Sequence, residues 1–483
     1  MSDSKRVCGV LLHLSSLWGD YSEGSAGKAA MEWIDFLASN EFSYWQVLPF
    51  CLPDEYYSPY KSYGSFSLNP YMIDLPELYR QGLITGEELK NARQALPWYC
   101  EFDRLEKERL TLLGAAAKRY GTTAELENFY ALHPHTENFC LFMALKVANN
   151  GLEWQKWTVT DPDPDALVTW RFTQFEFYRQ WQKIREYAAA KNIKIIGDIP
   201  IYVSSDSADV WESPDMYRLD SDGYPSSVAG VPPDYFCADG QLWGNPLYNW
   251  EKMAGNGYKW WRERMSFMSE LFDGVRIDHF RGFEAYFSIP SNETTAKNGK
   301  WIKGPGLPLV EALKEAAGDM LIIAEDLGVI TDGVRKLVEQ SGLPGMRVLQ
   351  FGIPGSSDSP HLPHNYPSNC VAYTGTHDNN TLLGYVWELD ENSRRQLLEY
   401  CGYNDFENWN SGYSSIIRTM YSSHADTLIM PVQDLLLYGS DTRMNKPGSS
   451  DDNWNYRITR EQLDRIDTEM FRNFARLYGR NRK

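Results

Sequence analysis

Eight short apolar runs, each ending in polar residues, most strongly constrain the fold of this chain. The runs are continuous rather than alternating, which is typical of parallel strands that are buried on both faces. Helical patterns lie between several of them, for example at 27–39 and 309–317. The eight runs lie at 7–13, 44–49, 193–200, 274–279, 321–326, 347–351, 371–377 and 427–433. The sequence therefore predicts an α/β fold, a (β/α)8 TIM barrel.

The spacing between the runs is uneven, and it predicts insertions within a single catalytic barrel domain that spans residues 1–483. Residues 75–187, after the second predicted strand, carry mostly helical patterns and are expected to form a helical subdomain. Residues 204–262, after the third strand, are rich in Pro, Gly, Asp and aromatic residues, which predicts a loop-rich insertion over the barrel mouth. Residues 291–308 predict a short insertion after the fourth strand.

Composition excludes several classes of partner. The formal net charge of −18 argues against nucleic acid, because binding phosphates requires a basic surface. No run of about 20 apolar residues is present, so we expect no membrane-spanning helix.

The seven Cys are odd in number and include no Cys-x-x-Cys pair, which fits reduced thiols in a cytoplasmic enzyme. Monomer and homodimer both stay open. Aromatic residues form 14% of the chain, which fits either a large aromatic core or a sugar-binding surface.

Three acidic residues stand at the carboxyl ends of predicted strands. They are Asp278, Glu325 and Asp378. A carboxylate at the end of a buried strand is costly unless it is paired, hydrogen-bonded or used in chemistry. Barrel enzymes carry their active sites at this end of the strands. We therefore expect the three acids to form one constellation at the barrel mouth, an arrangement that suits chemistry on a glycosidic bond.

Two of these acids have neighbours that suggest a role. Alternation along the strand puts Arg276 and Asp278 on the same side, so the guanidinium can hold the carboxylate ionised, as a nucleophile requires. A purely structural ion pair is the alternative. Glu325 follows an apolar run, and apolar surroundings raise a carboxyl pKa, which suits a general acid. The alternative is a helix cap, for which Asp326 is the more natural residue.

His377 precedes Asp378 directly, and such a pair could belong to a metal site. However, no ligand spacing such as His-Glu-x-x-His occurs in the chain. We interpret the pair as hydrogen-bonding groups for sugar hydroxyls. A dinucleotide fingerprint is also absent, and no metal or other cofactor is expected. A Gly-x-Ser-x-Gly nucleophile motif does not occur either.

Several motifs make the chain similar, over nearly its full length, to the 4-α-glucanotransferases of the amylomaltase or disproportionating-enzyme type, glycoside hydrolase family 77. The most specific are Ser-Pro-Tyr-Lys-Ser at 58–62, Gly-Gln-Leu-Trp-Gly-Asn-Pro at 240–246, Gly-Val-Arg-Ile-Asp-His-Phe at 274–280 and Thr-His-Asp-Asn-Asn-Thr at 376–381. Further matching segments lie at 9–17, 69–75, 196–201, 230–236 and 323–328.

The resemblance implies transfer of α-1,4-glucan segments from a maltooligosaccharide, starch or glycogen donor to the 4-hydroxyl of glucose, maltose or another glucan. It implies a retaining mechanism with a covalent glucosyl–enzyme intermediate. Asp278 would be the nucleophile, Glu325 the acid/base and Asp378 the group that stabilises the distorted donor sugar. Sugar contacts are implied for Ser58, Tyr60, Asp198, Asp234, Gln241, Trp243, Asn245, Arg276, His279 and His377.

Other classes of protein share these features. An α-glucan hydrolase of the amylase type would use the same barrel and acids, but it would release reducing ends in proportion to the bonds that it cuts. A non-catalytic glucan-binding protein could be built on the same scaffold, because fold alone does not establish activity. A metal-dependent barrel enzyme is a third alternative, which a chelator would test.

Overall fold

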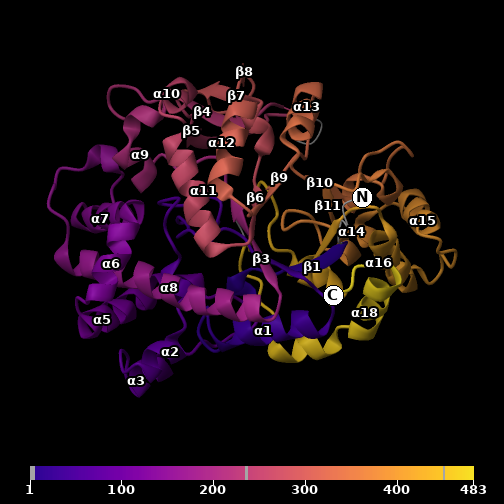
Figure 1. Cartoon of the computed structure of the whole chain (residues 1–483), viewed down its shortest axis with the longest axis horizontal. Helices are drawn as coiled ribbons and strands as arrows, with labels where there is room; N and C mark the ends of the chain where they lie inside the picture. Colours follow the sequence, from indigo (N-terminus) through magenta and orange to yellow (C-terminus); the bar gives the residue numbers. More distant parts are fainter. Residues whose placement is uncertain (1–5, 234–237, 450–451, 483) are drawn as a thin grey trace.

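Eight parallel strands close into a barrel at the centre of the molecule (Figure 1). This computed structural model describes residues 6–233, 238–449 and 452–482. The strand order is β1-β12-β11-β10-β9-β6-β3-β2. The strands are β1 (Val7–Leu11), β2 (Tyr44–Gln46), β3 (Lys194–Ile199), β6 (Gly274–Ile277), β9 (Leu321–Ala324), β10 (Gly345–Val348), β11 (Cys370–Tyr373) and β12 (Thr427–Pro431). The predicted (β/α)8 barrel is confirmed, and each predicted run contributes one strand.

The barrel strands are buried on both faces, which explains their continuous apolar runs. Every residue of β1, β6, β11 and β12 is buried. The strand β10 departs from the prediction, because it begins at Gly345 and the expected end of the run forms a 3-10 turn, Leu349–Phe351. The backbone N–H of Met346 donates to the Asp326 carboxylate at 2.6 Å, which fixes the start of β10 next to β9.

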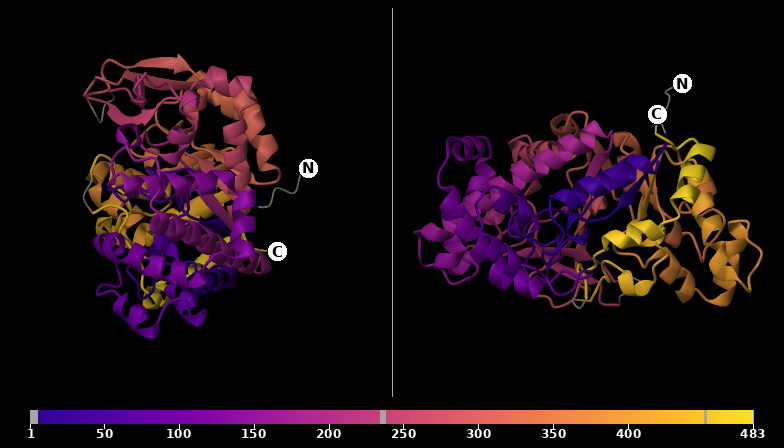
Figure 2. Two further views of the ribbon diagram at one scale, coloured as in Figure 1. Left: turned by 90° about the vertical axis from the view of Figure 1, so that its left-hand side faces the viewer. Right: turned by 90° about the horizontal axis from the view of Figure 1, so that it is seen from below.

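A largely helical segment lies between β2 and β3. It contains α2 (Leu75–Arg80), α3 (Gly86–Asn91), α4 (Phe102–Arg104), a π-helical turn (Leu105–Arg109), α5 (Leu110–Tyr120), α6 (Ala124–Leu132), α7 (Pro134–Ala148) and α8 (Pro164–Ala190). These helices bury an aromatic cluster of their own that includes Phe129, Phe139 and Trp170. The end of α8 belongs to the barrel instead, because Trp181 packs against Trp45 of β2. Figure 2 shows this segment and the C-terminal helices at opposite ends of the molecule.

A second, antiparallel sheet lies on one side of the barrel, with the order β5-β4-β7-β8. Its strands are β4 (Ser227–Val231), β5 (Gln241–Pro246), β7 (Ala285–Pro290) and β8 (Lys300–Lys303). The sequence does not predict this sheet, because β4 and β5 contain Gly, Asn and Pro, which are depleted in strands. The insertion at 204–262 also holds α9 (Ala208–Glu212), α10 (Trp250–Gly255) and the start of α11 (Lys259–Leu271).

The remaining helices lie around the barrel (Figure 1). They are α1 (Lys28–Ser39), α12 (Leu307–Ala317), α13 (Asp332–Ser341), α14 (Leu382–Glu388), α15 (Glu391–Tyr400), α16 (Tyr413–Ser422), α17 (Val432–Leu435) and α18 (Thr468–Leu477). Beyond α18, the buried guanidinium of Arg480 donates to the backbone carbonyls of Val7, Ser423 and Ala425. It thereby joins the chain's C-terminal part to the starts of β1 and β12. Among the described helices, none is long and apolar enough to cross a membrane.

Candidate active site

A cleft opens at the carboxyl ends of the barrel strands. It is lined by Ser58, Tyr60, Lys61, Pro200, Ile201, Tyr202, Trp243, Asn245, Asp278, His377, Asp378, Asn445, Pro447 and Trp454. These residues come from the loops after β2, β3, β6, β11 and β12, together with β5. The structure therefore brings residues from most of the chain to the end of the barrel where catalytic groups are expected.

Arg276 on β6 connects two carboxylates at the floor of the cleft. Its Nη2 donates to Oδ1 of Asp278 at 2.6 Å, and its Nη1 donates to Oδ2 of Asp198 at 2.6 Å. Tyr60 donates its hydroxyl to the same Asp198 oxygen at 2.8 Å. Arg276 and Asp198 are almost fully buried, whereas 31% of the Asp278 side chain is exposed. The predicted side-by-side placement of Arg276 and Asp278 is confirmed, and charge-assisted hydrogen bonds fix the Asp278 carboxylate toward the cleft.

Glu325 follows β9 and lies next to the turn that carries Asp278. Its two carboxylate oxygens accept the backbone N–H groups of His279 and Leu327, each at 2.7 Å. Burial, together with the negative charge of Asp278, raises the pKa of Glu325 well above that of an ordinary Glu, although Arg276 and the two N–H groups oppose the shift. Glu325, whose raised pKa favours its protonated form near neutral pH, therefore lies beside Asp278, which is paired with Arg276.

The structure does not support the alternative in which Glu325 or Asp326 caps a helix that follows β9. The next helix after β9, α13, begins only at Asp332, and Glu325 instead accepts the backbone N–H of His279, just before the 3-10 turn Phe280–Phe283. The neighbouring Asp326 accepts a hydrogen bond from the backbone of Met346 and pairs with Arg347 at 3.1 Å. Asp326 therefore holds β9 to β10, whereas Glu325 binds the turn that carries Asp278.

His279 has an unusual backbone conformation, with φ of 48°. A left-handed conformation is uncommon for residues other than Gly and often marks a functional site. Its backbone N–H is held by Glu325, and its ring lies edge-on to Trp243 at 4.9 Å between centroids. Burial lowers the pKa of His279 to about 4, so the ring is neutral at pH 7. Its Nε2 is buried and has no protein partner among the described residues.

The turn after β11 presents His377 and Asp378 to the cleft. The amide of Asn445 donates to Oδ1 of Asp378 at 2.6 Å, and Nε2 of His377 lies 3.3 Å from the same oxygen. Burial would raise the pKa of Asp378, but His377, Asn445 and Arg276 outweigh it and hold the pKa well below the ordinary range. Tyr60 stacks on the His377 ring at 4.9 Å. Asp378 is therefore an ionised acceptor at the open cleft.

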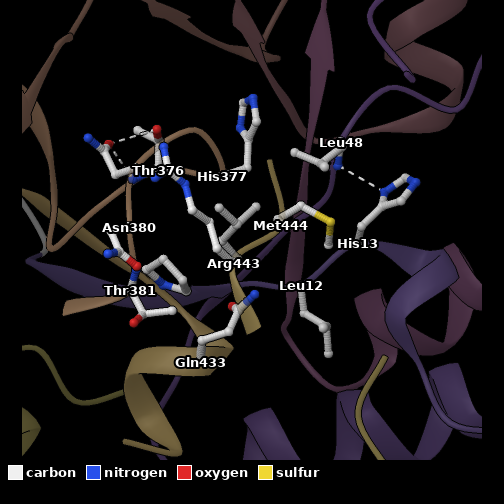
Figure 3. Close-up of a pocket in the computed structure, with 13 residues that line it drawn as sticks. Leu12, His13, Leu48, Thr376, His377, Asn380, Thr381, Gln433, Arg443 and Met444 are labelled. Carbon is white, nitrogen blue, oxygen red and sulfur yellow. Dashed lines mark hydrogen bonds between the residues drawn. The ribbon is translucent and has the colours of Figure 1, made fainter. Parts of the chain in front are cut away.

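Hydrogen bonds hold the underside of this turn in place. Asn379 accepts the backbone N–H of Thr376 at 2.9 Å, and Gln350 donates to the carbonyl of Asn380 at 2.8 Å. The guanidinium of Arg443 donates to the carbonyl of Asp378 and to that of Asn445. In Figure 3, Arg443 and Met444 lie between the turn and the side chains that follow β1 and β2. The C-terminal segment thus fixes the position of Asp378.

Several groups at the cleft were not predicted from the sequence. A polar stretch without a helical or strand pattern contains Arg443, Asn445 and Trp454. The one feature of the sequence that could have pointed to this stretch is a lone Trp in a polar loop. Lys61 belongs to the Ser-Pro-Tyr-Lys-Ser motif at 58–62, but the sequence predicted no role for it. Among the described residues, no group of three or more His, Cys, Asp or Glu is placed to hold a metal ion.

Five of the predicted residues that the structure describes are not among the residues that line the cleft. Four of them, Asp198, Arg276, His279 and Glu325, are buried or nearly so and contact residues that line it or each other. Gln241 is exposed, and its side chain accepts a hydrogen bond from the Trp243 indole at 3.0 Å. It therefore lies at the rim and supports Trp243. Asp234 lies outside the described residues, in the gap at 234–237.

Known proteins resemble this chain along its whole length. The sequence model of a family described as 4-alpha-glucanotransferase matches residues 12–463. A 4-alpha-glucanotransferase from Streptococcus pneumoniae is 39% identical over 500 residues, which cover 99% of this chain and 98% of the relative. One from Synechocystis is 40% identical over 501 residues, with coverage of 99% and 98%. The structure of an amylomaltase from Streptococcus agalactiae in complex with acarbose has a TM-score of 0.93 at 34% identity, covering 99% of this chain and 100% of that chain.

Proposed function

This chain belongs to the 4-alpha-glucanotransferase family, glycoside hydrolase family 77, and from that premise we propose that it transfers α-1,4-glucan segments by a retaining mechanism at Asp278, Glu325 and Asp378. The observation that carries the proposal is the position of Asp278, held by Arg276, beside the buried Glu325, which binds the backbone of the same turn and whose pKa is raised by burial. A nucleophile and a general acid in different protonation states are what a retaining glycosidase site requires.

In the first step, Asp278 attacks the anomeric carbon of the donor sugar while Glu325 gives its proton to the glycosidic oxygen. The carbon–oxygen bond of the donor breaks, and the reducing-end fragment leaves as an alcohol. The transferred segment is now a β-linked ester of Asp278. Asp378, which the surrounding groups keep ionised, accepts hydrogen bonds from the hydroxyls of the distorted sugar.

In the second step, the ionised Glu325 removes the proton from the 4-hydroxyl of an acceptor glucan. The acceptor oxygen attacks the anomeric carbon, the ester bond to Asp278 breaks, and an α-1,4 bond forms again. Two inversions give net retention. His377 lines the cleft and is placed to bind sugar hydroxyls in both steps. We assign the same role to neutral His279, whose Nε2 has no protein partner among the described residues.

Transfer exceeds hydrolysis only where the acceptor is held in place and water is kept from the intermediate. Trp243 on β5 lies against His279 at the edge of the cleft, and Trp454 faces Tyr60 at 5.8 Å from another wall. Rigid aromatic surfaces of this kind bind the apolar faces of sugars and displace water. We assign Trp243 and Trp454 the role of holding the donor and the acceptor.

Membership of the family also underlies our proposals for the donors, the acceptors, the location of the reaction and the oligomeric state. We propose maltooligosaccharides and starch- or glycogen-type glucans as donors, and glucose, maltose or another glucan as acceptor. The reaction would take place in the cytoplasm. A monomer or a homodimer would serve equally, because every group named above comes from one chain.

The role of Glu325 is tested by Glu325→Gln, which keeps the shape of the side chain but has no proton to give. We expect kcat/KM for maltotriose to fall by about 1,000-fold. In the wild type, kcat/KM should fall as pH rises through the raised pKa of Glu325, since the acid form is lost above it. That alkaline fall should disappear in the variant.

A donor with a good leaving group separates this role from a structural one. Because α-maltosyl fluoride needs no general acid, Glu325→Gln should release about one fluoride per protein molecule in a fast burst and then stall as the ester. Steady turnover of maltotriose by the variant, or an unchanged alkaline limb, would remove Glu325 from the role of acid/base.

A further inference from the structure

A buried carboxylate beneath the cleft, that of Asp434, has no role in the steps described above. Asp434 lies on α17, directly after β12, and only 1% of it is exposed. Like the three acids of the site, it follows a barrel strand, where an unused carboxylate is costly. We propose that Asp434 is a positioning residue for glucan transfer, which holds the loop at 375–381 that carries His377 and Asp378. This role rests on the proposed function, in which Asp378 binds the donor sugar.

The two carboxylate oxygens of Asp434 contact both ends of that loop. Oδ2 accepts the hydroxyl hydrogen of Thr374, the residue that follows β11, at 2.5 Å. Oδ1 accepts the backbone N–H of Leu382, the first residue of α14, at 2.7 Å. All three residues are buried. One side chain therefore joins the start of the 375–381 loop to its end.

The charge of Asp434 strengthens these two contacts. Burial raises the pKa of Asp434 to about 6, although the hydrogen bonds from Leu382 and Thr374 oppose the shift. The group is therefore mostly ionised at pH 7, and both of its oxygens are acceptors. Hydrogen bonds to an ionised acceptor are about twice as strong as those between neutral groups. Because both bonds are buried, removing one would leave a polar group without a partner.

The segment that follows α17 holds the middle and the tip of the same loop. Ser440 accepts a hydrogen bond from the side-chain amide of Asn380 at 2.9 Å. Nearer the tip, the backbone N–H of Asn445 donates to the carbonyl of His377 at 3.1 Å, and the Asn445 side chain donates to Asp378 at 2.6 Å. The loop is thus supported from base to tip by one stretch of chain, and α17 supplies the support at the base.

Loosening the base of the loop should displace His377 and Asp378 without removing either. A misplacement of about 1 Å at a site can lower a rate by about 100-fold. Asp434→Ala loses both hydrogen bonds, and we expect kcat/KM for maltotriose to fall by about 100-fold. Asp434→Asn keeps the shape of the side chain, and its amide can still accept from Leu382 and donate to the Thr374 hydroxyl. It should stay within about fivefold of the wild type.

The test is a double-mutant cycle with Asp378→Asn, which on its own should lower kcat/KM by about 1,000-fold. If Asp434 acts through Asp378, adding Asp434→Ala to that variant should lower kcat/KM by less than about fivefold more. A larger further loss, or a loss below about tenfold in the wild-type background, would overturn the positioning role. Wild-type activity of Asp378→Asn would instead overturn the proposed function.

The matched control is Asp74→Ala, which removes a buried carboxylate that also accepts one hydroxyl and one backbone N–H. The donors are Ser25 at 2.9 Å and Glu77 at 3.0 Å, at the start of α2. Its kcat/KM should stay within about twofold of its parent in both backgrounds, because distant sites act independently. Amide hydrogen exchange at 375–381 should become faster in Asp434→Ala and stay unchanged in this control.

A milder variant keeps the role testable if Asp434→Ala does not fold. Thr374→Val removes only the hydroxyl donor and should lower kcat/KM by about tenfold in the wild-type background, but by less than about threefold in Asp378→Asn. Equal losses in the two backgrounds would overturn the role. A loss in Asp434→Asn as large as that in Asp434→Ala would also overturn it, since the charge rather than the two hydrogen bonds would then be what matters.

Discussion

Replacing Asp278 by Asn is expected to lower kcat/KM for maltotriose by about 10,000-fold or more, because the amide cannot form the ester on which both steps depend. The fold should be unaffected. The side chain is partly exposed at the cleft, and an amide oxygen can still accept the hydrogen bond from Arg276. Chromatography of the oligosaccharides formed from maltotriose, with unfolding followed in parallel, measures both effects.

The matched control is Asp332→Asn, which makes the same chemical change on α13 at a side chain that is 99% exposed. Its activity should equal that of the wild type. Residual transfer of more than about 1% by Asp278→Asn, from a preparation shown by mass to contain no Asp, would exclude Asp278 as the nucleophile.

Removal of the charge at Arg276 should damage both activity and stability. In Arg276→Met, the Asp278 carboxylate loses its orienting partner, and we expect kcat/KM to fall by about 1,000-fold. Asp198, whose side chain is fully buried, would keep only the Tyr60 hydroxyl as a hydrogen-bond donor. Leaving a buried carboxylate without its counter-charge costs about 3–5 kcal/mol, which should appear in the free energy of unfolding.

A double variant separates the two effects. In Asp198→Asn/Arg276→Met, the stranded charge is gone, so part of the lost stability should return while activity stays low. Arg276→Lys keeps a charge but has one ammonium rather than a planar fork, and it should not restore both contacts. An unfolding free energy of Arg276→Met equal to that of the wild type would show that Asp198 does not depend on the ion pair.

The barrel could be predicted from the sequence because its physical basis is local. Strands buried on both faces need an apolar residue at nearly every position, and the eight runs record that need directly. The boundary of β10 could not be predicted, since it is fixed by the contact from Asp326 to the backbone of Met346. The antiparallel sheet escaped prediction because its strands contain Gly, Pro and Asn and depend on pairing between distant segments.

Part of the candidate site could also be predicted from the sequence. The three acids stand out because a carboxylate after a buried strand needs a reason. The residues that hold them do not stand out. Asn445 and Arg443 reach Asp378 from more than 60 positions away in the sequence, and nothing in the polar segment around them indicates the contact. The left-handed turn at His279 likewise contacts Glu325, which follows another strand, β9.

The most direct test of glucan transfer is to incubate the wild-type enzyme with pure maltotriose and to follow all products together with the total number of reducing ends. A transferase that protects its glucosyl ester from water should give glucose and a ladder of longer maltooligosaccharides, with the number of reducing ends unchanged. Glucose and maltose with rising reducing ends would show that water is the acceptor, and would contradict the account.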